Sequence, residues 1–457
     1  LSIGDDLTIE PGVVIQVASG KGLSFDGSCS LFTASGNSSD HIVFEGQNNG
    51  TWKGLAFTDA CSTTAGTDDR HTMSYVDFKN TTDAAIAAGS RHGISPSSNA
   101  NVGNFTMDHV TFSNVGTAFE HGSGAGTVVT MSDFEVNDAS DACFNFAEDS
   151  VVTLTDGTMD DCNSGSNPTG GAIMNVAGST GGSLVLENID ITDSMVNLID
   201  VDLETVWISN LTATSASAQS GTVLAAEGAG ADSSLYVYNM DASGYGSASI
   251  YALSSMSLDT VDWGSANIAM APGGTSSTSA GPSGTSASIA GLTAGDLTMT
   301  RIAPTMNDID IGALAIIGNS PSSNGIMGEN WDTEGISIGA QQVSGCGYNI
   351  FVTNVTTDGI SGSCSNSASP NNIILSNVDA DYTGSNNAIY ARNSRITIGE
   401  GSVTLPSAFT GDMAQASTNG RIVLIDVDQD GTDCLTETDC DVTSGSSGTI
   451  YFGGLAT

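Results

Sequence analysis

The sequence predicts an all-β solenoid, in which a coil of short strands is wound many times around one core. A six-residue phrase (apolar, any, polar, apolar, any, apolar) recurs about fourteen times along the chain. Apolar residues alternate with period two, and Gly, Ser, Asn and Asp recur between the runs, which is typical of short strands joined by tight bends. Successive copies are at least 21 residues apart, with a variable excess. This indicates constant strands and variable loops.

The clearest copies of the phrase begin at Leu186 (LENIDI), Ile208 (ISNLTA), Val237 (VYNMDA) and Leu375 (LSNVDA). The third positions of all copies form one column: Tyr75, His109, Asp133, Asp156, Asn188, Asn210, Asn239, Thr260, Arg301, Asn330, Asn354, Asn377, Glu400 and Asp426. Stacked Asn and Asp residues at one bend can hydrogen-bond their equivalents in neighbouring rungs and satisfy backbone groups that the turn leaves unpaired. We therefore interpret the column as structural.

A second short apolar run follows many copies, which predicts two or three strands per turn. These runs surround Ile86, Phe144, Ile173, Ile199, Ile250 and Ile389. With parallel strands about 4.8 Å apart, about 14–17 rungs predict a single elongated domain over 1–457, about 80 Å long. Residues 1–60 are expected to form the opening rungs, and the Ser/Thr/Gly-rich stretch 271–295 is expected to be one surface loop. With only 27 aromatic residues, we expect a dry, aliphatic interior.

This pattern resembles the right-handed parallel β-helix of the pectin-lyase-like superfamily. The segment LTIEPGVVIQV (Leu7 to Val17), with the later HIVFEG and WKGLAF, is similar to the opening rungs of secreted prokaryotic surface proteins of that class, marine archaeal ones included. The resemblance covers essentially the whole chain. It is specific for the fold and weak for the function.

The charge balance restricts the partners. The chain has 51 acidic and 9 basic residues, a formal net charge of −42. Such a surface repels nucleic acid and anionic membranes and stays soluble in high salt. Two interpretations remain open: a solvated acidic face in a salty medium, or calcium-assisted adhesion or assembly. The sequence contains no run of about 18 apolar residues, so no membrane span is predicted. The chain begins at Leu1 without a signal sequence, as expected of a processed segment of a longer secreted protein.

The eight cysteines predict disulfides and an extracellular or cell-surface location. An even number without a C-x-x-C pair favours disulfides over zinc. Separations of 18 and 19 residues are close to one rung, so the sulfurs would lie on neighbouring coils. Consecutive pairing gives Cys29–Cys61, Cys143–Cys162, Cys346–Cys364 and Cys434–Cys440.

Six N-x-Ser/Thr sequons are present. Two of them, Asn210 and Asn354, belong to the column, where we expect a buried amide that cannot carry a sugar. Any glycans should therefore be attached to Asn37, Asn49, Asn80 and Asn104.

One metal motif lies near the C-terminus. Asp426, Asp428, Asp430, Gly431 and Glu437 match D-x-D-x-D-G-x5-E and resemble an EF-hand-type Ca²⁺ loop. Position eight of the loop is Asp433 in place of an aliphatic residue, and the flanks are predicted strands rather than helices. The segment 426–441, tied by its cysteines, is therefore either a Ca²⁺ loop or a solvated acidic loop, and Ca²⁺ is the only cofactor that the sequence suggests.

Groups suited to catalysis concentrate between residues 70 and 121: Arg70, His71, Arg91, His92, His109, Glu120 and His121. The tripeptides RHG and EHG are similar to the histidine-glycine element of polygalacturonases, but no N-T-D, G-H-G or R-I-K accompanies them. Polysaccharide lyases of this fold need a cationic base or calcium, and its hydrolases need paired carboxylates. We expect these histidines to lie in bends and loops. If the protein is an enzyme, Arg91, His92, His109, Glu120 and His121 are the candidates.

The favoured function is a non-catalytic, extracellular structural or adhesive protein of a cell surface or fibre. The alternatives are a polysaccharide lyase or glycoside hydrolase of the pectin-lyase-like superfamily, or a glycan-binding module. Irregular Thr positions argue against ice binding. Because a β-helix exposes strand edges at its ends, we expect contacts there with further copies of the chain or with the remainder of a longer surface protein. Carbohydrate is the other expected partner, and insertion into a membrane is not expected.

Overall fold

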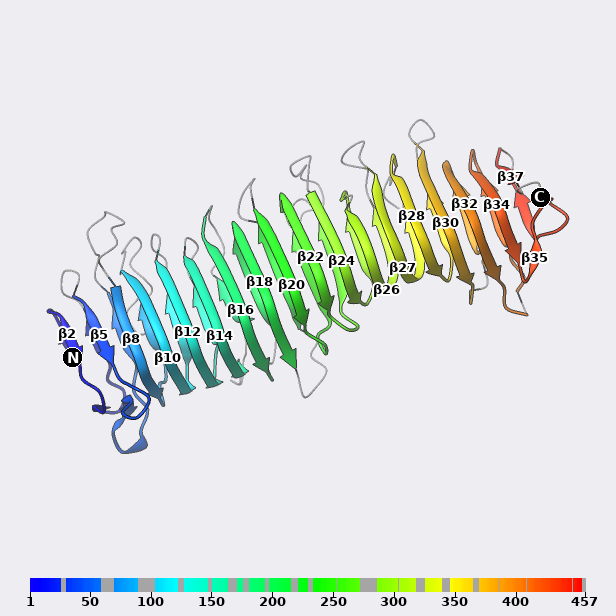
Figure 1. Cartoon of the computed structure of the whole chain (residues 1–457). Coiled ribbons are helices and arrows are strands. Elements are labelled where there is room, and N and C mark those ends of the chain that lie inside the picture. The colour runs from blue at the N-terminus through cyan, green and yellow to red at the C-terminus, as the bar shows by residue number, and fades with distance from the viewer. Residues whose placement is uncertain are drawn as a thin grey trace. The chain divides into compact units, whose positions relative to one another are not determined.

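The computed structural model (Figure 1) describes most residues of the chain. These are 1–25, 30–58, 70–88, 103–121, 127–146, 150–162, 171–175, 181–193, 197–214, 221–228, 233–251, 253–271, 286–302, 304–317, 325–338, 346–364, 370–384, 386–407, 409–445 and 447–453.

The chain divides into two compact units, unit 1 (Leu1–Leu253) and unit 2 (Ser254–Thr457), which are described separately. Apart from the 3-10 turn η1 (Gln47–Asn49), the regular elements of the described residues are strands. The strands pair in parallel, with β34 and β35 as the antiparallel exception. The predicted all-β parallel solenoid is therefore confirmed. The single domain over 1–457 stays a prediction.

Unit 1 contains strands β1 to β21. Their bounds are β1 (Ser2–Ile3), β2 (Leu7–Ile9), β3 (Val14–Val17), β4 (Leu23–Phe25), β5 (Phe32–Ser35), β6 (Ile42–Gly46), β7 (Leu55–Phe57), β8 (Arg70–Lys79), β9 (Ala84–Ala88), β10 (Asn104–Val115), β11 (Thr117–His121), β12 (Val128–Ala139), β13 (Phe144–Phe146), β14 (Val151–Cys162), β15 (Gly171–Asn175), β16 (Ser183–Thr192), β17 (Asn197–Leu203), β18 (Thr205–Thr214), β19 (Thr222–Gly228), β20 (Ser234–Asp241) and β21 (Ser247–Tyr251).

Unit 2 contains strands β22 to β37. Their bounds are β22 (Ser255–Asp262), β23 (Asn267–Ala271), β24 (Ser286–Ala294), β25 (Leu297–Thr300), β26 (Thr305–Ile317), β27 (Ile326–Ile338), β28 (Asn349–Thr357), β29 (Ile360–Ser363), β30 (Asn371–Asp381), β31 (Ile389–Arg392), β32 (Ser394–Thr404), β33 (Ala414–Ser417), β34 (Arg421–Gln429), β35 (Thr432–Asp433), β36 (Val442–Ser444) and β37 (Thr449–Gly453).

Each turn of unit 1 consists of three strand segments, and from β8 onward two of them are joined into one long strand. The first half of β8 pairs with β5, whereas its second half pairs with β6. Tyr75 lies at the junction with a φ of 50°. This left-handed residue turns the chain from one sheet to the next. Figure 1 shows the long strands of unit 1, from β8 in blue to β20 in green, lying side by side.

The column of bend residues predicted from the repeat is confirmed with one correction. Its residues have φ between 48° and 58°. In unit 1 they are Tyr75, His109, Asp133, Asp156, Asn188, Asn210 and Asn239, and in unit 2 they are Thr260, Gly291, Asp308, Asn330, Asn354, Asn377, Glu400 and Asp426. Arg301 was wrongly assigned. It precedes β26, and Gly291 and Asp308 occupy the column instead.

The stretch 271–295 also differs from the prediction. Strand β24 occupies its C-terminal part, with IAGLTA (Ile289 to Ala294) as a copy of the repeat and Gly291 at the bend. Residues 272–285 lie outside the described residues. The described residues of this stretch are therefore mainly strand, contrary to the prediction of one surface loop.

The interior of unit 1 is more aromatic than we expected. Eleven of the 14 phenylalanines are buried between residues 25 and 146. Phe44, Phe78 and Phe112 stack in successive rungs with ring centroids 5.2 and 5.4 Å apart. Each repeats at the same core position, so its ring meets the ring of the next rung in an offset stack. The expectation of an aliphatic interior is wrong for these rungs.

Three of the four predicted disulfides are present: Cys143–Cys162 in unit 1, and Cys346–Cys364 and Cys434–Cys440 in unit 2. The first joins the loop before β13 to the end of β14, and so closes about one turn, as the separation of 19 residues predicted. Cys29 and Cys61 lie outside the described residues. Within the described part of the chain, no helix is long and apolar enough to cross a membrane.

Candidate functional site

The structure separates the residues that the sequence marked as catalytic candidates. Arg91 and His92 lie outside the described residues. His71 and His121 are buried in the core of unit 1, whereas His109 and Glu120 lie toward the outer surface. His71 contacts the rings of Phe57 and Phe105, and its Nδ1 accepts a hydrogen bond from the backbone N–H of Phe32. These positions do not form one site.

His121 and its neighbour Glu120 point to opposite faces of β11. The imidazole of His121 is within hydrogen-bond distance of the hydroxyls of Ser150 (2.9 Å) and Thr127 (3.0 Å). Burial lowers the pKa of His121 to about 4, so this residue is a neutral core histidine near pH 7. On the other face, burial raises the pKa of Glu120, and the nearby carboxylates of Asp141 and Asp83 raise it further. The two side chains therefore lie in separate surroundings, one in the core and one beside surface carboxylates.

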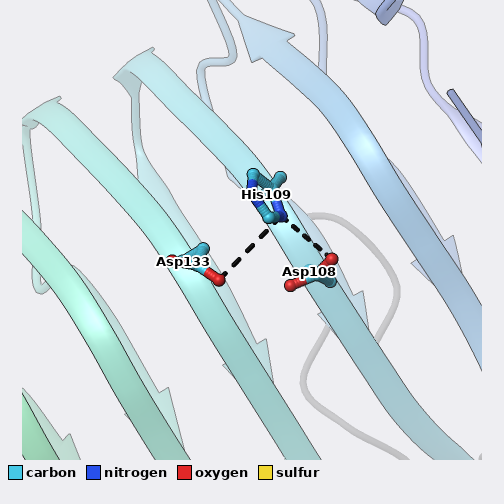
Figure 2. A group of neighbouring side chains, drawn as sticks. All are labelled: Asp108, His109 and Asp133. Atoms are coloured by element: carbon cyan, nitrogen blue, oxygen red, sulfur yellow. Dashed lines mark hydrogen bonds and ion pairs between the residues drawn. The ribbon is translucent and has the colours of Figure 1, made fainter. Parts of the chain in front are cut away.

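His109 lies on the surface in a cluster with two carboxylates (Figure 2). Its Nδ1 lies 2.9 Å from Oδ2 of Asp108 and 4.0 Å from Oδ2 of Asp133. The imidazole also stacks on the ring of Tyr75, with centroids 4.3 Å apart. This is the only group of three described His, Cys, Asp or Glu residues whose ligand atoms lie within 4.8 Å of one another.

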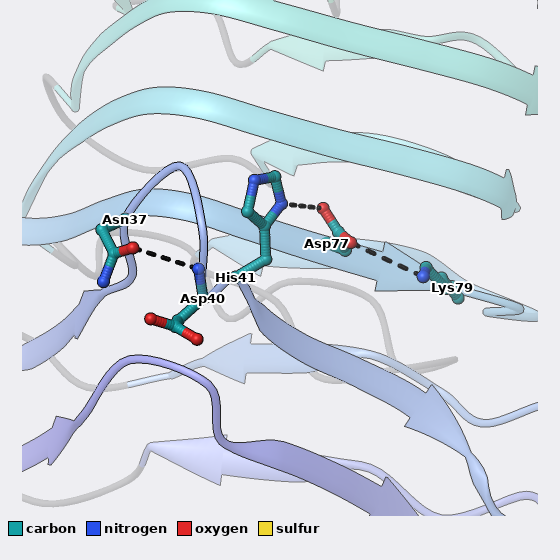
Figure 3. Close-up of polar contacts among 5 residues, drawn as sticks. All are labelled: Asn37, Asp40, His41, Asp77 and Lys79. Atoms are coloured by element: carbon teal, nitrogen blue, oxygen red, sulfur yellow. Dashed lines mark hydrogen bonds and ion pairs between the residues drawn. The ribbon is translucent and has the colours of Figure 1, made fainter.

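A second surface histidine, His41 (Figure 3), has its ring centroid 5.6 Å from that of Tyr75. His41 Nδ1 is 3.0 Å from Oδ1 of Asp77, and Lys79 Nζ is 3.5 Å from the other oxygen of the same carboxylate. Asn37 stabilises the turn before His41, because its Oδ1 accepts a hydrogen bond from the backbone N–H of Asp40. His41 therefore has one carboxylate partner, which a lysine shares, whereas His109 has two.

Two aspartates of the acidic loop 426–441 are engaged by backbone groups. Oδ1 of Asp428 accepts the backbone N–H of Gly431, and Oδ1 of Asp430 accepts that of Leu405. Asp428 faces Asp433 across the β34–β35 hairpin, which the Cys434–Cys440 disulfide follows. No three carboxylates of this loop, Glu437 included, come within 4.8 Å of one another. Calcium binding by this loop stays a prediction.

The amides of the bend column form ladders. In unit 1, Nδ2 of Asn188 donates to Asp156, that of Asn210 to Asn188, and that of Asn239 to Asn210, at 2.8 to 2.9 Å. These residues are exposed, so our expectation of buried amides is wrong. A sugar on Asn210 would replace one of the two hydrogens of Nδ2, the group that donates the ladder hydrogen bond to Asn188. Asn37 and Asn49 are exposed, and Asn80 and Asn104 are half-buried.

A second column, which we did not predict from the sequence, lies two residues after the bend. It is the fifth position of the repeat, where the pattern allows any residue. Every residue in it carries a side-chain oxygen, and we call it the oxygen column. Its residues in unit 1 are Asp77, Thr111, Glu135, Thr158, Asp190, Thr212 and Asp241, and those in unit 2 are Asp262, Thr293, Asp310, Asp332, Thr356, Asp379, Ser402 and Asp428. The signal was present in the sequence: no apolar residue occurs there.

In unit 2 the oxygen column borders two hollows of about 450 and 460 Å³. A third hollow, of about 370 Å³, shares Glu334 and Asp358 with the first and is lined by Tyr382, Ile336 and Ile360. We call these three hollows the acidic groove. None of the described residues that line it is Lys or Arg. Its chemistry suits ligands with hydroxyl or amino groups and repels anions.

Threonine is more regular on unit 1 than the sequence suggested. Thr8, Thr33, Thr72, Thr106, Thr130 and Thr153 face one another in successive rungs. The neighbouring column, with Ser74 and Ser132, is interrupted by Asp108. The expectation of irregular Thr positions, which argued against ice binding, is therefore wrong for this face, although the regular array is only one column wide.

No protein-family model, curated protein or solved structure matches this chain.

Proposed function

We propose that the protein is a non-catalytic structural and adhesive component of an extracellular surface. The observation that carries the proposal is the outer face of the coil, where the same bend and the same oxygen-bearing position recur from rung to rung. Such repetition provides a stiff, polar surface of uniform chemistry. Disulfides form and persist in oxidising environments, and the three in the structure support an extracellular location.

The adhesive role is supported by the acidic groove of unit 2. It combines carboxylates, which accept hydrogen bonds from sugar hydroxyls, with the ring of Tyr382 and aliphatic side chains, against which the apolar face of a sugar can pack. We therefore propose neutral or amine-bearing glycans as the ligands. Uronate polymers would be repelled unless calcium bridged them. A glycan-binding module is accordingly the second candidate function.

A panel of neutral, amine-bearing and uronate polysaccharides tests both roles. We expect neutral or amine-bearing polymers to be retained without chain cleavage, and the double variant Glu334→Gln/Asp358→Asn to lose most of that retention. Glu329→Gln is the matched control, since Glu329 is exposed on the same strand β27 and does not line the groove. New reducing or unsaturated chain ends would instead establish an enzyme. Equal retention by all three proteins would rule out the acidic groove as the glycan-binding site.

We also propose that the end rungs engage further polypeptide, either another copy of the chain or another part of a longer surface protein. Within the described residues, β2 and β3 pair with β5 and β6 on one edge only, and an unpaired parallel edge recruits strands. Electron microscopy should show head-to-tail contacts. If Ca²⁺ binds the loop 426–441 at such a junction, chelation should separate the particles. Single particles under all conditions would contradict the assembly.

A further inference from the structure

The surface cluster around His109 has the composition of a metal site. One imidazole nitrogen and two carboxylate oxygens lie within 4.8 Å of one another. As Figure 2 shows, the three side chains come from two neighbouring strands, β10 and β12, and converge on the same point of the surface. Three protein ligands with one open position are the usual arrangement of an accessible zinc site.

The fold holds these ligands in place before any ion binds. His109 and Asp133 occupy the bend column in adjacent rungs, with φ of 53° and 48°, so their side chains leave the backbone in the same direction. The hydroxyl of Ser132 donates to Oδ1 of Asp108 at 2.9 Å, which leaves Oδ2 directed at His109. The stacked ring of Tyr75 supports the imidazole from the preceding rung. Such hydrogen bonds and packing orient metal ligands.

The bend column carries unbalanced negative charge at this point. Asp133 and Asp156 occupy successive rungs, and only the next residue of the column, Asn188, supplies an amide donor to Asp156. Like charges that face each other on neighbouring strands are destabilising. A bound cation beside Asp133 would relieve that repulsion, which the amide ladder relieves elsewhere.

The donor set selects the class of ion. Ca²⁺ and Mg²⁺ prefer sites made entirely of oxygen, whereas Zn²⁺, Ni²⁺ and Cu²⁺ accept imidazole nitrogen together with carboxylate oxygen. We propose that Asp108, His109 and Asp133 form a binding site for a divalent transition-metal ion of the Zn²⁺ type. The fourth position faces solvent, where water or a ligand atom from another molecule can complete the coordination.

Calorimetric titration of the intact protein with Zn²⁺ tests the site. Excess Ca²⁺ is kept present so that it occupies the weak sites of the acidic surface. We expect one tight site per chain, and we expect the affinity to fall more than about tenfold in His109→Asn and in Asp133→Asn. Both substitutions place Asn, which tolerates positive φ, at the bend. Thermal melts recorded with a chelator confirm that the variants are folded.

The matched control is His41→Asn, which removes an exposed imidazole that has a single carboxylate partner (Figure 3). This variant should bind Zn²⁺ as tightly as the unchanged protein. In nitrogen NMR spectra, Zn²⁺ should shift the imidazole signal of His109 and leave that of His41 in place. Three results would overturn the proposal: a weak multi-site isotherm alone, unchanged binding by His109→Asn, or an equal loss in His41→Asn.

Discussion

Two stretches of the bend column in unit 1 have the same backbone and opposite side-chain chemistry. At Asn188, Asn210 and Asn239 each amide donates to the residue in the rung before, and the ladder is self-sufficient. At His109 and Asp133 the backbone has the same left-handed φ, but the side chains are a ring and a carboxylate. The backbone therefore determines where the bend lies, and the side chain determines whether the bend supports the coil or faces outward for a ligand.

The largest expected effect is a pH dependence of the rungs near His109, because strand β11, which follows β10, holds the buried His121. Because the pKa of His121 is lowered from 6.5 to about 4, the folded state binds a proton less readily than the unfolded state. Its stabilising contribution is complete above pH 6.5 and is lost as the pH falls toward 4, a loss of about 3 kcal/mol. Protonation of Glu120, whose pKa is raised, offsets part of this loss.

Hydrogen exchange at pH 7 and pH 4.5, corrected for intrinsic rates, checks this prediction. Protection should fall in the rungs around β11 and should change little in β16, β18 and β20, which contain no histidine. His121→Gln should remove most of the pH dependence around β11. A uniform loss of protection along unit 1 would contradict the assignment to His121.

The next effect breaks the ladder itself. Asn210→Ala removes two side-chain hydrogen bonds and places Ala at a φ of 51°. We expect a loss of about 2 kcal/mol in the free energy of unfolding, about half of it from the backbone. Asn210→Gly should lose less, because Gly accepts this φ without strain. Denaturant unfolding of both variants measures how the loss divides between the hydrogen bonds and the backbone strain. Equal losses would mean that the backbone conformation contributes nothing.

A smaller effect extends the ladder into the charged stretch. In Asp156→Asn the new amide can donate to Asp133, as Asn188 donates to Asp156 now. We expect a gain of about 0.5–1 kcal/mol in the metal-free protein, because a like-charge pair is replaced by a hydrogen bond. Thermal melts in the presence of a chelator provide the measurement, with Asp190→Asn as a control at the exposed oxygen column. A lower melting temperature in Asp156→Asn than in the control would refute this reading of the column.

The smallest effect concerns Asp161, a left-handed residue at the end of β14. Asp161 is exposed, and a slight loss of solvation raises its pKa, which the carboxylates of Asp160, Asp193 and Asp138 raise further. Asp161→Asn should therefore raise the melting temperature slightly at pH 7, and this gain should disappear at a pH where the carboxyl is protonated. Thermal melts of Asp161→Asn and the unchanged protein at pH 7 and pH 3 test the direction of this change in melting temperature.

The repeat made the fold predictable, because the bend requires residues that tolerate positive φ, and Asn and Asp stand out there. The rung at Gly291 was missed because Gly satisfies the same backbone requirement without being polar, and Arg301 was assigned in its place. The buried histidines could have been recognised from strand alternation, since His71 is in phase with Met73 and His121 with Phe119. The cluster at His109 could also have been recognised, because the predicted column places His109 and Asp133 in adjacent rungs and Asp108 directly precedes His109. It was missed because the column was interpreted only as structural.

The disulfides of the coil have a mechanical consequence. A solenoid pulled at its ends can unwind turn by turn, and each turn released lengthens the chain. Cys143–Cys162 closes a covalent ring over a sequence separation of 19 residues, so tension passes through the sulfur bridge and bypasses the enclosed residues. At about 3.4 Å per extended residue, that ring withholds about 60 Å of length. A pulled molecule should therefore extend less under oxidising conditions than after reduction.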